Sequence, residues 1–149
     1  MPPRLKVLVA EDSRVGQIVA RRLLEKLGHV PVFACNGAEA LERLRGETFD
    51  LVLMDCQMPE LDGYEVTRAL RSGGPPLDPT LPVIALTASD SEEDRERCLD
   101  AGMDHYLVKP VTLESLHRAI CETLGGVQSP EAQQASTSGP PDGRGVQPG

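Results

Sequence analysis

Four short apolar runs each end on a polar residue, and this pattern constrains the fold more than any other feature of the sequence. The runs are residues 7–10, 51–54, 83–86 and 106–108, and they are followed by Glu11 with Asp12, by Asp55, by Thr87 and by Lys109. Aliphatic runs without polar alternation are typical of strands buried on both faces of a parallel sheet. Because the carboxyl ends of parallel strands share one edge, we expect these polar residues to converge there.

The segments between the runs show helical periodicity with recognisable ends. Val15, Val19 and Leu23 recur at four-residue spacing and Gly28 follows them, which predicts a helix after the first run. Asn36 and Glu39 are expected to cap a second helix. This second helix is expected at residues 38–44, after an extra strand at 30–34. Three further helices are expected at residues 64–71, from Ser91 to Gly102 and from Thr112 to Leu124.

Five strands therefore alternate with five helices, which indicates the α/β class with a parallel sheet and right-handed crossovers. We predict a single (βα)5 domain with a flavodoxin-like, doubly wound sheet in the strand order 2-1-3-4-5. The length of 149 residues and the hydrophobic content of 40% suit one domain with its own core. The folded domain is predicted at residues 4–125, and the Gly/Pro/Ser-rich composition of residues 126–149 predicts a disordered tail.

Charge and composition argue against several classes of partner. The net charge of -8 and the lack of a basic cluster beyond Arg21 and Arg22 argue against nucleic-acid binding. No stretch approaches the roughly 20 apolar residues of a membrane span, and no signal-peptide pattern is present, so we expect a cytoplasmic protein without membrane insertion. The four cysteines form no C-x-x-C pair, so we expect buried thiols rather than a zinc site or disulfides.

The three expected carboxylates at the sheet edge favour a bound cation. Glu11, Asp12 and Asp55 would repel one another strongly if no cation lay between them. Mg2+ takes one or two protein carboxylates together with phosphate oxygens, and Mn2+ is an expected substitute. Asp12 or Ser13 also has a purely structural interpretation as the N-cap of the following helix, and capping and metal binding are compatible.

The remaining strand ends suit phosphoryl transfer. An aspartate such as Asp55 can attack phosphorus, while Thr87 supplies a hydroxyl donor and Lys109 a point charge. Only 3 of the 15 basic residues are lysine, so the lysine at 109 indicates that a compact ammonium is needed there. Taken singly, Asp55 could also be a loop carboxylate without a partner, and Lys109 could also be a solvated charge at the end of a strand. Pro110 suggests a rigid turn, with a cis bond as one alternative.

Four segments carry a resemblance to a known family: VLVAEDS, LVLMDCQMPELDGYEVTRALR, LPVIALTA and AGMDHYLVKPV. Together they resemble the receiver domain of two-component response regulators, most of all the receivers of hybrid sensor histidine kinases, over about residues 4–125. The resemblance implies that Asp55 is the phosphoacceptor and that Lys109 pairs with the phosphoryl group. It also implies that Asp12 and Asp55 bind Mg2+ by carboxylates, Gln57 by its backbone carbonyl and Glu11 through water.

The resemblance further implies a two-state switch. Thr87 would bind a phosphoryl oxygen after transfer, and Tyr106 would change rotamer to fill the vacated space. Gln57, Ala88 and Ser89 would tune access to the phosphoacceptor. The face formed by the helix 91–102, the strand 106–108 and the helix 112–124 would contact a protein target.

The resemblance also identifies the kind of phosphodonor and two departures from the family pattern. The donor would be a histidine kinase or a histidine phosphotransfer domain, because His29, His105 and His117 lack a kinase-like context and are expected at the surface or at element boundaries. Ser13 and Gly16 stand where hybrid-type receivers often carry Asn. Close packing of Gly16 against a neighbouring helix is the expected explanation for the glycine.

Three functional classes follow. The first is a phosphoacceptor receiver that catalyses only its own phosphorylation and dephosphorylation and is no conventional enzyme; if it is a fragment of a hybrid protein, the parent would be a histidine kinase. The second is a receiver-like interaction module that works without phosphorylation. The third is an Asp-nucleophile phosphohydrolase of the haloacid dehalogenase kind, but such enzymes need a second aspartate where Gln57 stands.

Overall fold

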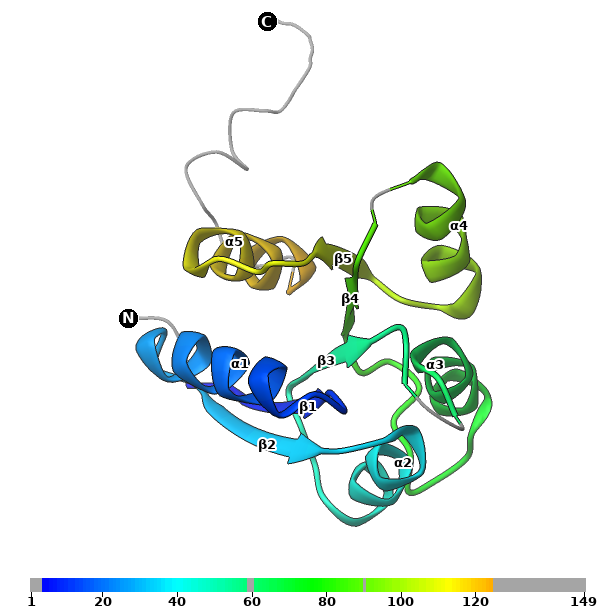
Figure 1. Cartoon of the computed structure of the whole chain (residues 1–149). Coiled ribbons are helices and arrows are strands. Elements are labelled where there is room, and N and C mark those ends of the chain that lie inside the picture. Colours follow the sequence, from blue (N-terminus) through cyan, green and yellow to red (C-terminus); the bar gives the residue numbers. More distant parts are fainter. Residues whose placement is uncertain (1–3, 59–60, 90, 125–149) are drawn as a thin grey trace, which may run out of the picture.

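Five parallel strands form a single sheet that lies between two layers of helices (Figure 1). The computed structural model describes residues 4–58, 61–89 and 91–124, so the predicted tail at 126–149 lies outside the described residues. The strands are β1 Lys6–Ala10, β2 Val30–Ala34, β3 Leu51–Asp55, β4 Val83–Thr87 and β5 His105–Val108. The helices are α1 Arg14–Lys26, α2 Gly37–Gly46, α3 Gly63–Ser72, α4 Glu92–Ala101 and α5 Leu113–Thr123.

The strand order β2-β1-β3-β4-β5 confirms the predicted topology. All four strand pairs are parallel, and the register places Ala10 beside Met54 and Asp55 beside Leu86. β1, β3 and β4 are thus neighbours at the centre of the sheet. Their carboxyl ends bring the residues after Ala10 close to Asp55 and Thr87.

The two faces of the sheet pack against different helices. α1 and α5 cover one face, and α2, α3 and α4 cover the other (Figure 1). Successive residues of a strand point to opposite faces, so in β1 Val7 and Val9 contribute to the core beneath α1 and α5, while Leu8 contributes to the core beneath the other three helices. Both faces are buried, which explains why the strands lack polar alternation. Within the described ranges, no helix has the length and apolar character needed to cross a membrane.

Helix ends follow local capping rules. Ser13, rather than Asp12, caps α1, because its hydroxyl accepts a hydrogen bond from the Gly16 N–H at 3.2 Å. Asn36 caps α2 as predicted, with its Oδ1 2.8 Å from the Glu39 nitrogen. Gly102 ends α4 with a φ of 99°, a left-handed conformation that glycine adopts without strain.

Two expectations about single residues were wrong, those for Gly16 and Cys35. Gly16 faces the side chain of Glu11 rather than a neighbouring helix. His29 lies at an element boundary as expected, directly before β2, and it is buried there, with its Nδ1 accepting the Leu5 N–H at 3.1 Å, because the start of β2 lies beside the start of β1. Cys35 is exposed, whereas the other three cysteines are buried; all four lie in the described ranges, where none forms a disulfide.

Candidate active site

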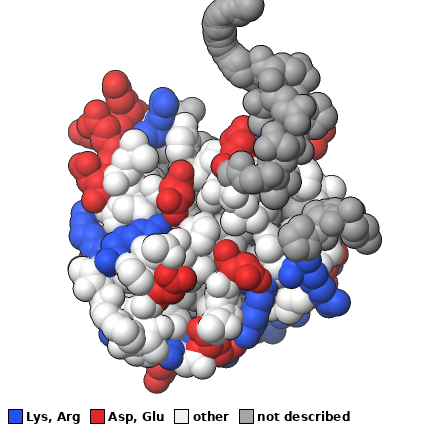
Figure 2. Space-filling view, turned by 180° about the vertical axis from the view of Figure 1, so that it is seen from behind, with Lys and Arg blue, Asp and Glu red and all other residues white. Residues whose placement is uncertain are grey.

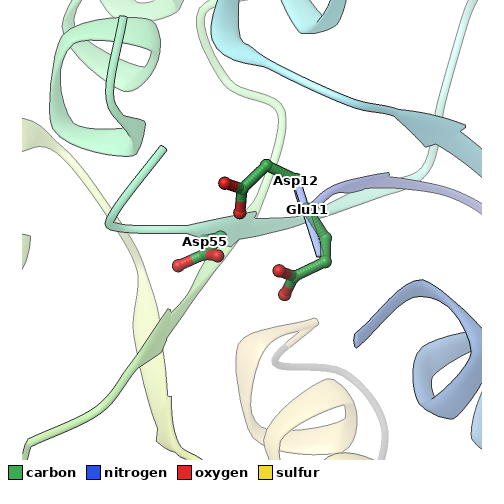
Figure 3. Close-up of side chains that lie close together, drawn as sticks. All are labelled: Glu11, Asp12 and Asp55. Atoms are coloured by element: carbon green, nitrogen blue, oxygen red, sulfur yellow. The ribbon is translucent and has the colours of Figure 1, made fainter. Parts of the chain in front are cut away.

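Three carboxylates converge at the carboxyl edge of the sheet. Glu11 and Asp12 follow β1 and Asp55 ends β3, and one carboxylate oxygen of each lies within 4.8 Å of the others. Figure 3 shows the three side chains gathered beyond the strand ends. Glu11 and Asp55 are only 2% and 4% exposed, whereas Asp12 is open to solvent. The cluster is therefore buried on one side and accessible on the other.

Lys109 supplies positive charge to this cluster. Its Nζ lies 3.2 Å from Asp55 Oδ2 and 3.3 Å from Glu11 Oε1. The Lys109 N–H donates to the Thr87 carbonyl at 2.8 Å, and the following bond to Pro110 is cis. Burial opposes the charge of Lys109, but the charges of Asp55 and Glu11 outweigh this effect and raise the pKa of Lys109. The side chain is therefore an ammonium held directly at the carboxylate of Asp55.

Glu11 is held by a set of local contacts. Its Oε2 accepts the Ser13 N–H at 3.1 Å, and the Gln17 side-chain amide donates to its backbone carbonyl at 2.7 Å. A Cβ on Gly16 would lie only 2.6 Å from the Glu11 Cδ, so the glycine makes room for the carboxylate. Burial, together with the nearby charge of Asp55, raises the pKa of Glu11.

Thr87 lies at the edge beside this cluster but its hydroxyl is engaged elsewhere. The hydroxyl donates to the Ser89 carbonyl at 3.0 Å and accepts the Ser89 N–H at 3.2 Å. Tyr106 lies on β5, the edge strand, where it is half-buried with the Arg95 guanidinium of α4 5.6 Å from its ring centroid. Ala88 is exposed at the start of the loop that follows β4.

The loop after β3 is anchored to the phosphoacceptor candidate. Asp55 Oδ1 accepts the Gln57 N–H at 3.0 Å, and the Gln57 side chain is exposed. The structure therefore gathers Glu11, Asp12, Asp55 and Lys109, places Gln57 and Thr87 next to them, and leaves Tyr106 outside the cluster. The sequence interpretation missed Gln17 and the role of Gly16, because no local pattern signals which side chain lies over a glycine.

The donor set fits a hard divalent cation. Three carboxylates and one ammonium leave a formal charge of -2 on the cluster, which a divalent ion would neutralise. All available donors are oxygens, as Mg2+ prefers, and the exposed side of Asp12 leaves room for water and phosphate ligands. Elsewhere, the face seen in Figure 2 carries basic and acidic side chains interspersed rather than one continuous positive surface.

Comparisons with known proteins agree with this site. The family model of the response regulator receiver domain matches residues 7–121. The chain is 46% identical over 116 residues to hybrid signal transduction histidine kinase H of Dictyostelium discoideum, an alignment that spans 75% of this chain and 8% of that protein. It is 36% identical over 143 residues to histidine kinase 5 of Arabidopsis thaliana, with 80% and 16% covered. The chain spans only 6 to 8% of the length of three Dictyostelium hybrid proteins that it matches.

Two solved structures are similar over most of the chain. One is the receiver domain of a sensor histidine kinase from Pseudomonas aeruginosa with a magnesium ion coordinated in the active site cleft; it has a TM-score of 0.74 and 36% identity, and 83% of this chain and 99% of that chain are covered. The other comes from a complex of a Saccharomyces cerevisiae histidine phosphotransfer signaling protein with the receiver domain of its downstream response regulator. It has a TM-score of 0.74 and 27% identity, and 86% of this chain and 94% of that chain are covered.

Proposed function

The chain belongs to the response regulator receiver domain family, and from this premise we propose that Asp55 accepts a phosphoryl group from a phosphohistidine in a Mg2+-dependent reaction. The observation that carries the proposal is the contact of the Lys109 ammonium with Asp55, at 3.2 Å, inside a cluster of three carboxylates. A nucleophile, a metal site and a cation for the phosphoryl oxygens thus lie together at one sheet edge.

The metal site would use oxygens of four residues. Asp12 and Asp55 would bind Mg2+ by their carboxylates, Gln57 by its backbone carbonyl and Glu11 through water. Support comes from the oxygen donor set of this cluster and from the magnesium ion in the similar Pseudomonas receiver. When bound, Mg2+ supplies charge neutralisation for the phosphoryl oxygens. Mn2+ would fill the same role.

With Mg2+ bound, the transfer step forms one bond and breaks one. A carboxylate oxygen of Asp55 attacks phosphorus, the phosphorus–nitrogen bond of the phosphohistidine breaks, and the electron pair leaves with the imidazole. The products are an aspartyl phosphate and histidine. Lys109 stabilises the charge on the phosphoryl oxygens, for which its ammonium is already positioned.

The phosphoryl group would then move Thr87. Its hydroxyl would exchange the two bonds to Ser89 for one to a phosphoryl oxygen, which would draw the loop after β4 inward. Tyr106, which is half-buried beside α4, would change rotamer as that loop moves. The resulting change on the α4–β5–α5 face would be read by a protein target, while Gln57, Ala88 and Ser89 would control water access to the phosphoryl group.

The partner and the wider context belong to the same proposal. The yeast complex supports a histidine phosphotransfer protein as the donor, and a histidine kinase is the alternative donor. We further propose that the receiver domain spans residues 4–125, followed by a tail at 126–149, and that the location is cytoplasmic. If this chain is one piece of a hybrid protein, the parent protein would be a histidine kinase.

Intact-mass spectrometry after incubation with acetyl phosphate and Mg2+ tests the proposal. We expect a gain of one phosphoryl mass that requires Mg2+, is prevented by EDTA and is absent in Asp55→Asn. If a folded protein that binds Mg2+ gains no mass, or if Asp55→Asn gains the same mass, the proposed role of Asp55 is wrong. A receiver-like module that works without phosphorylation would then be the better interpretation.

A further inference from the structure

A polar cleft extends from the proposed phosphoacceptor site toward α4. Its volume is about 490 Å³, and its walls include Asp12 and Gln57 from the site, Asp62 and Tyr64 at the start of α3, and Arg97 from α4. A phosphodonor bound at Asp55 would therefore have open space beside it, bounded on the far side by a guanidinium.

Arg97 is held in place by an aromatic ring rather than by a carboxylate. Its guanidinium carbon lies 4.2 Å from the centroid of the Tyr64 ring, a cation–π contact, and Tyr64 is only 4% exposed. Burial raises the pKa of Tyr64, so the phenol stays neutral and does not itself compensate the charge of Arg97. Among residues 4–58, 61–89 and 91–124, no carboxylate forms an ion pair with Arg97, although Asp12 and Asp62 line the same cleft.

An anchored guanidinium that has no carboxylate partner among the described residues is suited to bind one. We propose that Arg97 and the adjoining cleft form a subsite for a carboxylate at the distal end of the phosphodonor, as in an acyl phosphate of a dicarboxylic acid. This inference rests on the proposed role of Asp55, because it concerns the part of the donor that is not transferred. Without Arg97, the charged side chains among the described residues that line the cleft would be Asp12 and Asp62, which would repel this carboxylate.

Acetyl phosphate and succinyl phosphate form a matched pair of probes for this subsite. In both reactions Asp55 attacks phosphorus, the bond between phosphorus and the acyl oxygen breaks, and the carboxylate leaves with the electron pair as acetate or succinate. Succinyl phosphate carries a –CH2–COO− group in place of one methyl hydrogen of acetyl phosphate, so the two donors differ by one methylene and the distal carboxylate. A variant that changes only the phosphoryl transfer step changes both initial rates equally and leaves their ratio unchanged. A change in the ratio therefore reports on the subsite.

The chain offers a matched control on the same helix. Arg95 is also exposed and stacked on an aromatic ring, but its partner is Tyr106, and it lines a different cleft between α4 and β5. Arg97→Gln and Arg95→Gln remove the same charge from neighbouring positions. A general effect of net charge on an anionic donor would appear in both variants, whereas the subsite predicts an effect of Arg97→Gln alone.

The experiment measures initial phosphorylation rates of the full chain by intact mass at saturating Mg2+ and low, equal donor concentrations. We expect Arg97→Gln to lower the ratio of the succinyl rate to the acetyl rate by about three- to fivefold, the scale of a partly exposed ion pair, and Arg95→Gln to retain the wild-type ratio. An unchanged ratio in Arg97→Gln, or an equal loss in Arg95→Gln, would overturn the subsite while leaving the role of Asp55 intact. Failure of both donors to phosphorylate wild-type protein would instead overturn the role of Asp55, and the subsite with it.

Discussion

Replacing Gly16 with alanine tests how the buried carboxylate of Glu11 is held. An alanine Cβ at this position would lie 2.6 Å from Glu11 Cδ and 2.8 Å from Oε1, closer than such atoms can approach. The carboxylate must move, and it is buried and bound to the Ser13 N–H at 3.1 Å and to Lys109 at 3.3 Å. The substitution therefore has two opposing effects on stability: alanine favours the helix α1, and its Cβ displaces the carboxylate of Glu11.

The two contributions have opposite signs and different sizes. Alanine in place of glycine favours a helix by up to about 1 kcal/mol. Loss of the hydrogen bond between Ser13 and the charged carboxylate of Glu11 costs about 1.5–3 kcal/mol. With the full helix gain subtracted, we expect Gly16→Ala to lower the free energy of unfolding by about 0.5–2 kcal/mol, despite the better helix former.

Gly46 provides the control, because it lies in the last turn of α2 and a Cβ there meets nothing within 4 Å. Gly46→Ala should raise the free energy of unfolding by up to about 1 kcal/mol. Urea denaturation of both variants and of wild type, in buffer containing EDTA, measures these changes. If Gly16→Ala stabilises the protein as much as Gly46→Ala does, Glu11 is not confined as described.

Three further predictions concern metal binding, a hydrogen-bonded arginine and a buried histidine. Mg2+ at 100 times its dissociation constant should stabilise the protein by about 2.7 kcal/mol in thermal unfolding, and Asp12→Asn should lose most of this gain; equal stabilisation of the variant would exclude Asp12 as a ligand. Arg71 donates to the carbonyls of Gly102, Pro79 and Leu81 and to Asp104, so Arg71→Lys, which keeps the charge but not the planar fork, should cost about 2–4 kcal/mol in urea denaturation, and a cost near zero would contradict this role. Burial, with a smaller effect of His117, lowers the pKa of His29, so the unfolded chain takes up the proton first. The free energy of unfolding should therefore fall as pH drops below the ordinary histidine pKa of about 6.5, and His29→Gln should reduce this dependence; an unchanged slope in the variant would assign it to other groups.

Much of the scaffold of the site was predictable from short-range patterns. The apolar runs identified the strands that end at Asp55 and Thr87, and their burial on both faces explains why the runs lack polar alternation. The alternation of strands and helices then led to the observed strand order. Ser91 and Gly102 fixed the ends of α4, because capping depends on residues close in the chain.

Other features depend on contacts between residues far apart in the chain. The position of Glu11 over Gly16 and the ion pairs of Lys109 follow from side-chain conformations that the sequence pattern does not specify. His29 is buried because the start of β2 lies beside Leu5, which only the folded sheet determines. The stacking of Arg97 on Tyr64 joins residues on two different helices, so no pattern of neighbouring residues in the sequence indicates it.

The central claim is that Asp55 itself carries the phosphoryl group. After phosphorylation with acetyl phosphate and Mg2+, borohydride reduction converts an aspartyl phosphate into homoserine, which peptide mass spectrometry can locate. We expect homoserine at position 55 alone, and none when EDTA is present during phosphorylation. Homoserine at another aspartate, or a phosphorylated protein that yields none at position 55, would contradict the assignment of Asp55 as the phosphoacceptor.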